Sequence, residues 1–74
     1  MTEQLGDRIR KARLRFGISQ AELSRRIGIS KQAMYQIENN ITPDPGVLKV
    51  KAVAEVLEVS VDALLGRKVK AHAA

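Results

Sequence analysis

Two short helical patterns on either side of one glycine place the strongest constraint on how this chain folds. In residues 18–40, ISQAELSRRIGISKQAMYQIENN, apolar residues recur at helical spacing both before and after Gly28. Ser19 and Ser30 each precede one of the patterns and can accept a hydrogen bond from the first turn. Glu22 follows Ser19 by three residues and predicts a capping box. The segment is therefore expected to form two short, well-delimited helices.

The connection between the two helices also meets the packing demands of a helix-turn-helix unit. Gly28 supplies the positive φ that the turn needs, at no steric cost. Ser24 is small enough for the close crossing of the two helices. Apolar residues on both helices and in the turn can hold the unit to a core: Leu23, Ile27, Ile29, Met34 and Ile37.

The rest of the chain predicts three further helices and no strand, which gives an all-α domain over residues 1–66 and a basic, mobile tail over 67–74. Gly17, Asn40 and Gly66 are expected to end helices, because Gly and Asn tolerate the left-handed conformation. Asp44 and Pro45 are expected as the N-cap and first residue of the fourth helix, with Val47 on its inner face. The five helices are expected at about residues 3–16, 20–27, 31–39, 45–57 and 61–65.

Charge is distributed unevenly along the 74 residues, whose net charge is +5. Residues 8–31 carry eight Lys and Arg against one acid, whereas residues 32–66 carry two Lys against five acids. Such polarity suits a chain that presents one face to a polyanion, although a solvated basic surface is the simpler alternative. The chain has no Cys and a single histidine, His72, so we expect no disulfide, no zinc site and no cofactor.

The outer face of the third predicted helix carries the chemistry of base recognition. With Met34 and Ile37 turned inward, its outward residues are Lys31, Gln32, Tyr35, Gln36 and Asn39. Gln can pair with adenine N6 and N7, and Lys can donate to guanine O6 and N7. An ordinary solvated helix face is the alternative, but such faces usually carry Glu as well as Lys.

The stretch from Leu5 to Leu65 resembles the Cro/phage-repressor family of helix-turn-helix domains, also called Xre-like or lambda-repressor-like. That family folds as a compact five-helix domain with the helix-turn-helix unit at helices 2 and 3. The matching positions are Ile9, Arg13, Gly17, Ser19, Gln20, Glu22, Leu23, Gly28, Ile29, Ser30, Ile37, Glu38, Asn39, Pro45, Ala54, Leu57, Val59, Ser60 and Leu64.

The resemblance implies a role for several residues. Gln20 matches a glutamine that clamps a DNA phosphate and braces the recognition helix, although helix-start chemistry alone could explain it. Lys31, Gln32 and Gln36 match base-reading positions, with Tyr35 at the edge. Arg13 and Glu38 match a partly buried ion pair. We expect DNA-backbone contacts from Ser30, Asn39, Arg10, Arg25 and Arg26, and hypothesise that Arg8 and Arg15 also lie near the phosphates.

The resemblance further implies a small transcriptional regulator, expected to be a repressor, in the cytoplasm of a bacterium or of a phage-infected cell. It is expected to act as a homodimer on an inverted-repeat operator in double-stranded DNA. Two copies would bind half-sites about 34 Å apart. The short fifth helix cannot turn every apolar residue inward, so Leu65, with Val61 nearby, is the candidate dimer contact. No membrane and no small-molecule ligand are expected.

Several positions depart from the family pattern. Ser24 replaces the usual Ala, and its hydroxyl can bond back to a carbonyl. Asn40 and Glu58 replace the usual Gly, and a left-handed Glu58 would carry a strain of about 1 kcal/mol. The loop from Ile41 to Pro45 is one residue longer than the common pattern.

Three other functions are alternatives to sequence-specific binding of double-stranded DNA. The first is a protein-binding module on the same fold, such as an antitoxin, in which DNA binding is secondary. The second is binding of RNA or single strands, but Phe16 and Tyr35 do not form a stacking platform. The third is an enzyme, for which the sequence offers no nucleophile–base pair and no phosphate-binding loop.

Overall fold

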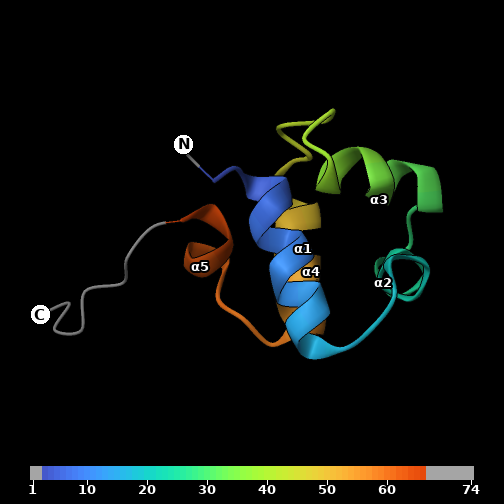
Figure 1. The fold of residues 1–74 in the computed structure, drawn as a ribbon, viewed down its shortest axis with the longest axis horizontal. Coiled ribbons are helices and arrows are strands. Elements are labelled where there is room, and N and C mark those ends of the chain that lie inside the picture. The colour runs from blue at the N-terminus through green and yellow to red at the C-terminus, as the bar shows by residue number, and fades with distance from the viewer. Residues whose placement is uncertain (1–2, 67–74) are drawn as a thin grey trace, which may run out of the picture.

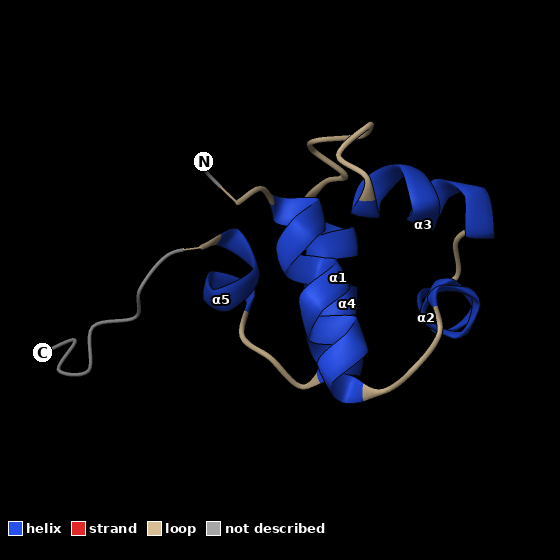
Figure 2. Ribbon diagram, viewed as in Figure 1, coloured by secondary structure: helices blue, strands red, loops and turns tan. Residues whose placement is uncertain are grey.

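The computed structural model describes residues 3–66, and this part of the chain contains five α-helices and no strand (Figure 2). The all-helical prediction is confirmed over this range. The predicted tail at 67–74, with His72, lies outside the described residues. The helices are α1 (Leu5–Phe16), α2 (Gln20–Ile27), α3 (Lys31–Glu38), α4 (Val47–Leu57) and α5 (Val61–Leu65).

Helix α1 is the centre of the arrangement. It packs against α3, α4 and α5, while α2 packs against α3 and α4. Figure 1 shows α3 and α5 on opposite sides of α1. The two flanks of α1 therefore face different neighbours, and its side chains serve two separate surfaces.

The core lies between these helices and uses the residues that helical spacing predicts. Ile9, Leu23 and Met34 are completely buried, and they come from α1, α2 and α3 respectively. Each such aliphatic side chain stabilises the fold by about 2 kcal/mol. The other buried apolar residues are Ala12, Ile37, Val50, Val53, Ala54, Leu57 and Leu64. No helix within residues 3–66 is both long and apolar enough to cross a lipid bilayer.

Serine side chains begin three of the helices. Ser19, Ser30 and Ser60 each accept a hydrogen bond from the backbone N–H three residues later, at 2.9–3.0 Å. The predicted capping box also requires a second hydrogen bond, from the Ser19 N–H to the Glu22 carboxylate, and this part of the prediction is wrong. The Glu22 carboxylate instead accepts hydrogen bonds from Arg25 and Arg26, because guanidinium groups three and four residues along the helix are stronger partners.

The predicted start of α4 is also wrong. Gly46, with φ 98°, is the N-cap, so Asp44 does not cap the helix and Pro45 precedes it. The Asp44 carboxylate accepts from the Gly46 N–H at 3.2 Å, which closes a local turn before the helix begins. Val47 at the helix start is 72% exposed rather than turned inward. Smaller differences occur at α1, which begins at Leu5, and at α3, which ends at Glu38.

The end of α3 is anchored to the start of α1. Asn40 adopts the expected left-handed conformation, with φ 61°. Its Oδ1 accepts from the Gly6 N–H at 2.9 Å, and its Nδ2 donates to Asp7 at 3.1 Å. A Cβ at Gly6 would overlap the carbonyl oxygens of Ile37 and Glu38, so only glycine permits this approach. These contacts fix where α3 ends relative to α1.

Asp7 contributes to this anchor as a carboxylate. Its hydrogen bond from the Gln4 N–H is the main cause that holds the pKa of Asp7 below its ordinary value, and the Asn40 amide, Arg10 and Lys11 act in the same direction. A lowered pKa in the folded state means that the stabilisation is complete above the unfolded-state pKa. It is lost as the pH falls through the folded-state pKa.

Glu58 ends α4 in the left-handed conformation, with φ 59°, so the strain of about 1 kcal/mol that such a backbone implies applies to it. The buried Ser24 hydroxyl donates to the Ala21 carbonyl at 2.8 Å, which satisfies it within the helix. The departures from the family pattern at these two positions are therefore accommodated without a change of fold.

Candidate nucleic-acid interface

The outer face of α3 is open to solvent. Lys31, Gln32, Tyr35 and Asn39 are exposed, whereas Met34, Ile37 and Glu38 on the opposite face are buried. Gln36 is half-buried, so it is less prominent than its outward position in the sequence predicts. In Figure 1, α3 lies at the edge of the molecule and no other described element covers its outer side. A ligand can therefore reach the polar face of this helix.

The start of α2 borders the same face. Gln20, Lys31, Gln32 and Tyr35 line one shallow surface hollow between the two helices. The sequence analysis predicts DNA contacts for all four residues. The turn around Gly28, with φ 81°, brings them together. The hollow presents two side-chain amides, one ammonium group and one phenol, and within it there is no carboxylate that would repel an anion.

A buried network beneath this face holds α3 in place. The Arg13 guanidinium binds the Glu38 carboxylate through two hydrogen bonds of 2.7 and 3.0 Å, and Glu38 is only 1% exposed. Gln20 Nε2 donates to the same carboxylate at 3.1 Å, and Arg13 also donates to the Ile18 carbonyl at 3.0 Å. The network therefore links α1, the loop that follows it, the start of α2 and the end of α3.

Gln20 has donor capacity left after this contact. A side-chain amide carries two N–H donors, and one of them is used on Glu38. The second can donate to an anion at the surface hollow. The position of Gln20 is thus compatible with bracing α3 and with binding a phosphate at the same time.

Arg10 is the cation on α1 that lies on the α3 side of this helix. It shares a helical stripe with Gly6 and Arg13, both of which contact α3 residues, and it is exposed. Arg8 and Arg15 lie on the other flank, where they line a pocket with residues of α5. The sequence hypothesis places them near the phosphate-facing side together with Arg10, but the turn of the helix directs them towards α5, away from the flank that carries Arg10.

Arg25 and Arg26 lie on the exposed side of α2 and are both paired with Glu22. The Arg26 guanidinium, 2.7 Å from Glu22, and that of Arg25 hold the pKa of this carboxyl below its ordinary value. The three side chains together carry a net charge of +1. Their attraction for an anion is consequently weaker than two unpaired arginines would provide.

Ser30 and Asn39 lie at the two ends of α3, and both make contacts within the helix. The Ser30 oxygen accepts from the Ala33 N–H at 3.0 Å, which leaves its hydroxyl proton available. The Asn39 amide donates to the Tyr35 carbonyl at 2.8 Å and keeps a second N–H. Each retains one donor that could reach a phosphate.

An apolar groove lies near the start of α4 and the fifth helix. Leu65 is 39% exposed and Val61 is half-buried, and both line the groove with Leu5, Pro43 and Val47. Sequence reasoning missed Val47 as a surface residue, because the expected helix start at Pro45 turned it inward. Gly46, whose φ is 98°, is the one local sign in the sequence that the helix begins after Pro45 and leaves Val47 at the surface.

Comparison with known proteins gives a consistent picture. A model of the helix-turn-helix family matches residues 9–64. The transcriptional regulator SinR of Bacillus licheniformis is 36% identical over 64 residues, which are 86% of this chain and 58% of SinR. The chain therefore spans less than two thirds of the length of this relative.

Two solved structures share the fold. The P22 c2 repressor in complex with a synthetic operator superimposes with a TM-score of 0.81 and 34% identity, over 90% of this chain and all of that chain. SinR in complex with DNA superimposes with a TM-score of 0.78 and 34% identity, over 82% of this chain and 97% of that chain. The lambda-repressor-like fold expected from the sequence is confirmed.

Loss of the Arg13 guanidinium should destabilise the fold, because Glu38 would remain buried with its charge mostly uncompensated. We expect Arg13→Met to lower the free energy of unfolding by about 3 kcal/mol. Replacement of Glu38 by Gln in the same variant should restore part of that loss. Urea unfolding followed by circular dichroism measures both changes.

Arg15→Met is the matched control, since Arg15 is exposed on the same helix. It should change the free energy of unfolding by less than about 0.5 kcal/mol. Equal losses for Arg13→Met and Arg15→Met would show that the buried network does not stabilise the fold.

Proposed function

This chain belongs to the helix-turn-helix family, and from that premise we propose that it binds double-stranded DNA sequence-specifically and regulates transcription, as a repressor. The observation that carries the proposal is the exposed polar face of α3 beside Gln20, above the buried Arg13–Glu38 pair. The P22 c2 repressor and SinR, which share this fold, are both known in complexes with DNA.

The dimensions of α3 suit the major groove of DNA. An eight-residue helix is about 12 Å long, and the major groove is wide enough to admit a helix. Gln32 and Gln36 are one helical turn apart, so together they can address neighbouring base pairs. Lys31 at the first position of α3 and Tyr35 at the edge of the face complete the proposed set of base-reading residues.

The residues around this face supply the proposed contacts to the DNA backbone. The second amide N–H of Gln20, the Ser30 hydroxyl and the Asn39 amide can each donate to a phosphate oxygen. Arg10 on the α3 side of α1 adds a positive charge, and Arg25 and Arg26 add the net charge of their cluster with Glu22. These contacts would fix the register of α3 in the groove without reading sequence.

We also propose that two copies act together on an inverted repeat, because one α3 helix reads only a few base pairs. The apolar groove lined by Leu65, Val61 and Val47 is the proposed dimer contact. Exposed apolar side chains are costly in water, and a second copy would cover them. This contact lies outside the hollow that we assign to DNA.

The roles of α3 and Arg10 can be separated by their salt dependence. We expect Gln32→Ala to lose discrimination at particular base pairs, by about 1–3 kcal/mol, with an unchanged salt slope. Arg10→Ala should weaken binding to all sequences about equally and should make the slope of log K against log salt shallower by about one. Fluorescence anisotropy on a selected site and its single-base variants, at several salt concentrations, measures both quantities.

Arg15→Ala is the control for Arg10→Ala, since it removes the same charge from the other flank of α1. Its DNA affinity and salt slope should stay close to those of the unmodified chain. If Gln32→Ala and Arg10→Ala behave alike, the proposed division between base readout and backbone contact is incorrect.

The dimer contact is tested by Leu65→Asp. A carboxylate at this 39%-exposed position should weaken self-association and leave the monomer folded, because the side chain is not part of the buried core. Analytical ultracentrifugation measures the association, and circular dichroism checks the fold. An unchanged dimer in Leu65→Asp would place the contact elsewhere.

A further inference from the structure

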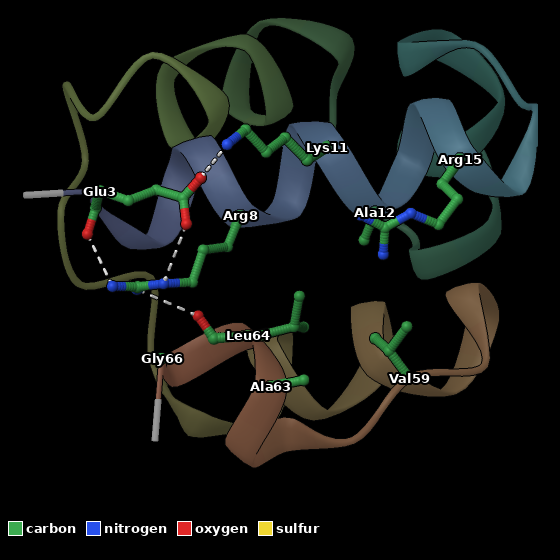
Figure 3. Close-up of a pocket in the computed structure, with 9 residues that line it drawn as sticks. All are labelled: Glu3, Arg8, Lys11, Ala12, Arg15, Val59, Ala63, Leu64 and Gly66. Atoms are coloured by element: carbon green, nitrogen blue, oxygen red, sulfur yellow. Dashed lines mark hydrogen bonds and ion pairs between the residues drawn. The ribbon is translucent and has the colours of Figure 1, made fainter. Parts of the chain in front are cut away.

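A second cationic surface lies on the flank of α1 that faces α5. Arg8, Lys11 and Arg15 follow one another along this flank and line a groove with Ala12, Val59 and Leu64 (Figure 3). Three positive charges therefore border an apolar floor in which Ala12 and Leu64 are buried, Val59 is half-buried and Ala63 is exposed. We call this surface the α1–α5 groove.

The α1–α5 groove continues past Arg15 towards the end of α1. A neighbouring hollow shares Ala12, Arg15 and Val59 with it and extends to Phe16, which is 38% exposed. The two hollows together follow α1 from Arg8 to Phe16, a length of about 13 Å for these nine residues. That length matches about two and a half turns of helix or about four residues of extended chain.

The groove already holds a carboxylate from within the chain. Glu3 forms ion pairs with Lys11 and, at 3.7 Å, with Arg8 (Figure 3). Arg8 is further fixed by hydrogen bonds to the carbonyls of Glu3 and Leu64, at 2.6 and 3.3 Å. No hydrogen bond or ion pair joins Arg15 to another residue within 3–66, so its charge is available where the two hollows meet.

We propose that the α1–α5 groove binds an acidic segment of a partner protein that also carries apolar side chains. Carboxylates of the segment would replace that of Glu3 at Lys11 and pair with Arg15, while its apolar side chains would cover the accessible parts of Val59, Ala63 and Phe16. This inference goes beyond DNA binding and does not depend on it.

The chemistry of the groove favours a protein segment over nucleic acid. A phosphate backbone would satisfy the three cations but would bring nothing apolar to the floor. The groove also lies on the opposite flank of α1 from α3, so a DNA molecule on the α3 face would leave it open (Figure 1). Residues 67–74 of the chain itself carry three cations and no acid, and their charge disfavours this site.

The test uses three synthetic, labelled twelve-residue peptides as probes: one of Glu and Leu with helical amphipathic spacing, one with Lys in place of Glu, and one of Glu, Gly and Ser. Binding to the whole chain is measured by fluorescence anisotropy and mapped by amide chemical shifts. The Glu–Leu peptide should bind, with shifts at Lys11, Arg15, Val59 and Ala63, while the Lys–Leu and Glu–Gly–Ser peptides should bind much more weakly.

Charge variants make the assignment specific. Lys11→Glu combined with Arg15→Glu should weaken binding of the Glu–Leu peptide by about tenfold, and Lys51→Glu on α4 should change it little. Glu3→Gln should strengthen binding about threefold, because it removes the internal competitor. Circular dichroism confirms that each variant is folded.

Three results would overturn the inference. The first is the absence of binding by the Glu–Leu peptide at millimolar concentration, and the second is shifts that map to α3. The third is equal binding by the unmodified chain and the Lys11→Glu, Arg15→Glu variant. A loss of DNA affinity in that variant, without peptide binding, would instead identify the groove as a nucleic-acid contact.

Discussion

The buried contact between Arg13 and Glu38 determines where the polar face of α3 points. A carboxylate that is 1% exposed loses its hydration, and it is stable here because it accepts two hydrogen bonds from Arg13 and one from Gln20. Within residues 3–66, no buried side-chain nitrogen or oxygen lacks a partner. A fully satisfied polar network of this kind favours one arrangement of its helices over alternatives. Gly6 and Asn40 support the same arrangement at the end of α3, through a close approach and a hydrogen bond of 2.9 Å.

The two flanks of α1 explain how one short helix serves two surfaces. Gly6, Arg10 and Arg13 share the flank that contacts α3, whereas Arg8, Lys11 and Arg15 share the flank that faces α5. The basic run at 8–15 is therefore divided between these surfaces, and only part of its charge is near the proposed DNA face. The same division makes Arg10 and Arg15 a matched pair for experiments that separate local contact from overall charge.

Much of the fold follows from local chemistry that is visible in the sequence. Ser19, Ser30 and Ser60 begin helices, and helical spacing identifies buried residues such as Ile9 and Met34, because these signals act over a few residues. The start of α4 could not be predicted in this way. Asp44 and Pro45 have the local pattern of a helix start, yet Gly46 takes that role with a φ of 98° and leaves Val47 exposed.

Prediction of the candidate site from the sequence has the same limit, because local patterns do not determine contacts between distant residues. The ion pair between Arg13 and Glu38 is present in the structure, and its prediction came from the family resemblance. The pairing of Glu22 with Arg25 and Arg26, and the direction of Arg8 and Arg15, depend on competition between partners and on the packing of α5. The linear order of charges does not contain that information.

Selection from a random library of double-stranded DNA, with sequencing of the bound pool, tests most directly whether the face fixed by the Arg13–Glu38 pair reads sequence. The account predicts enrichment of an inverted repeat whose half-sites are about ten base pairs apart, one helical turn. A bound pool without enrichment, together with salt-sensitive binding to DNA of any sequence, would contradict it.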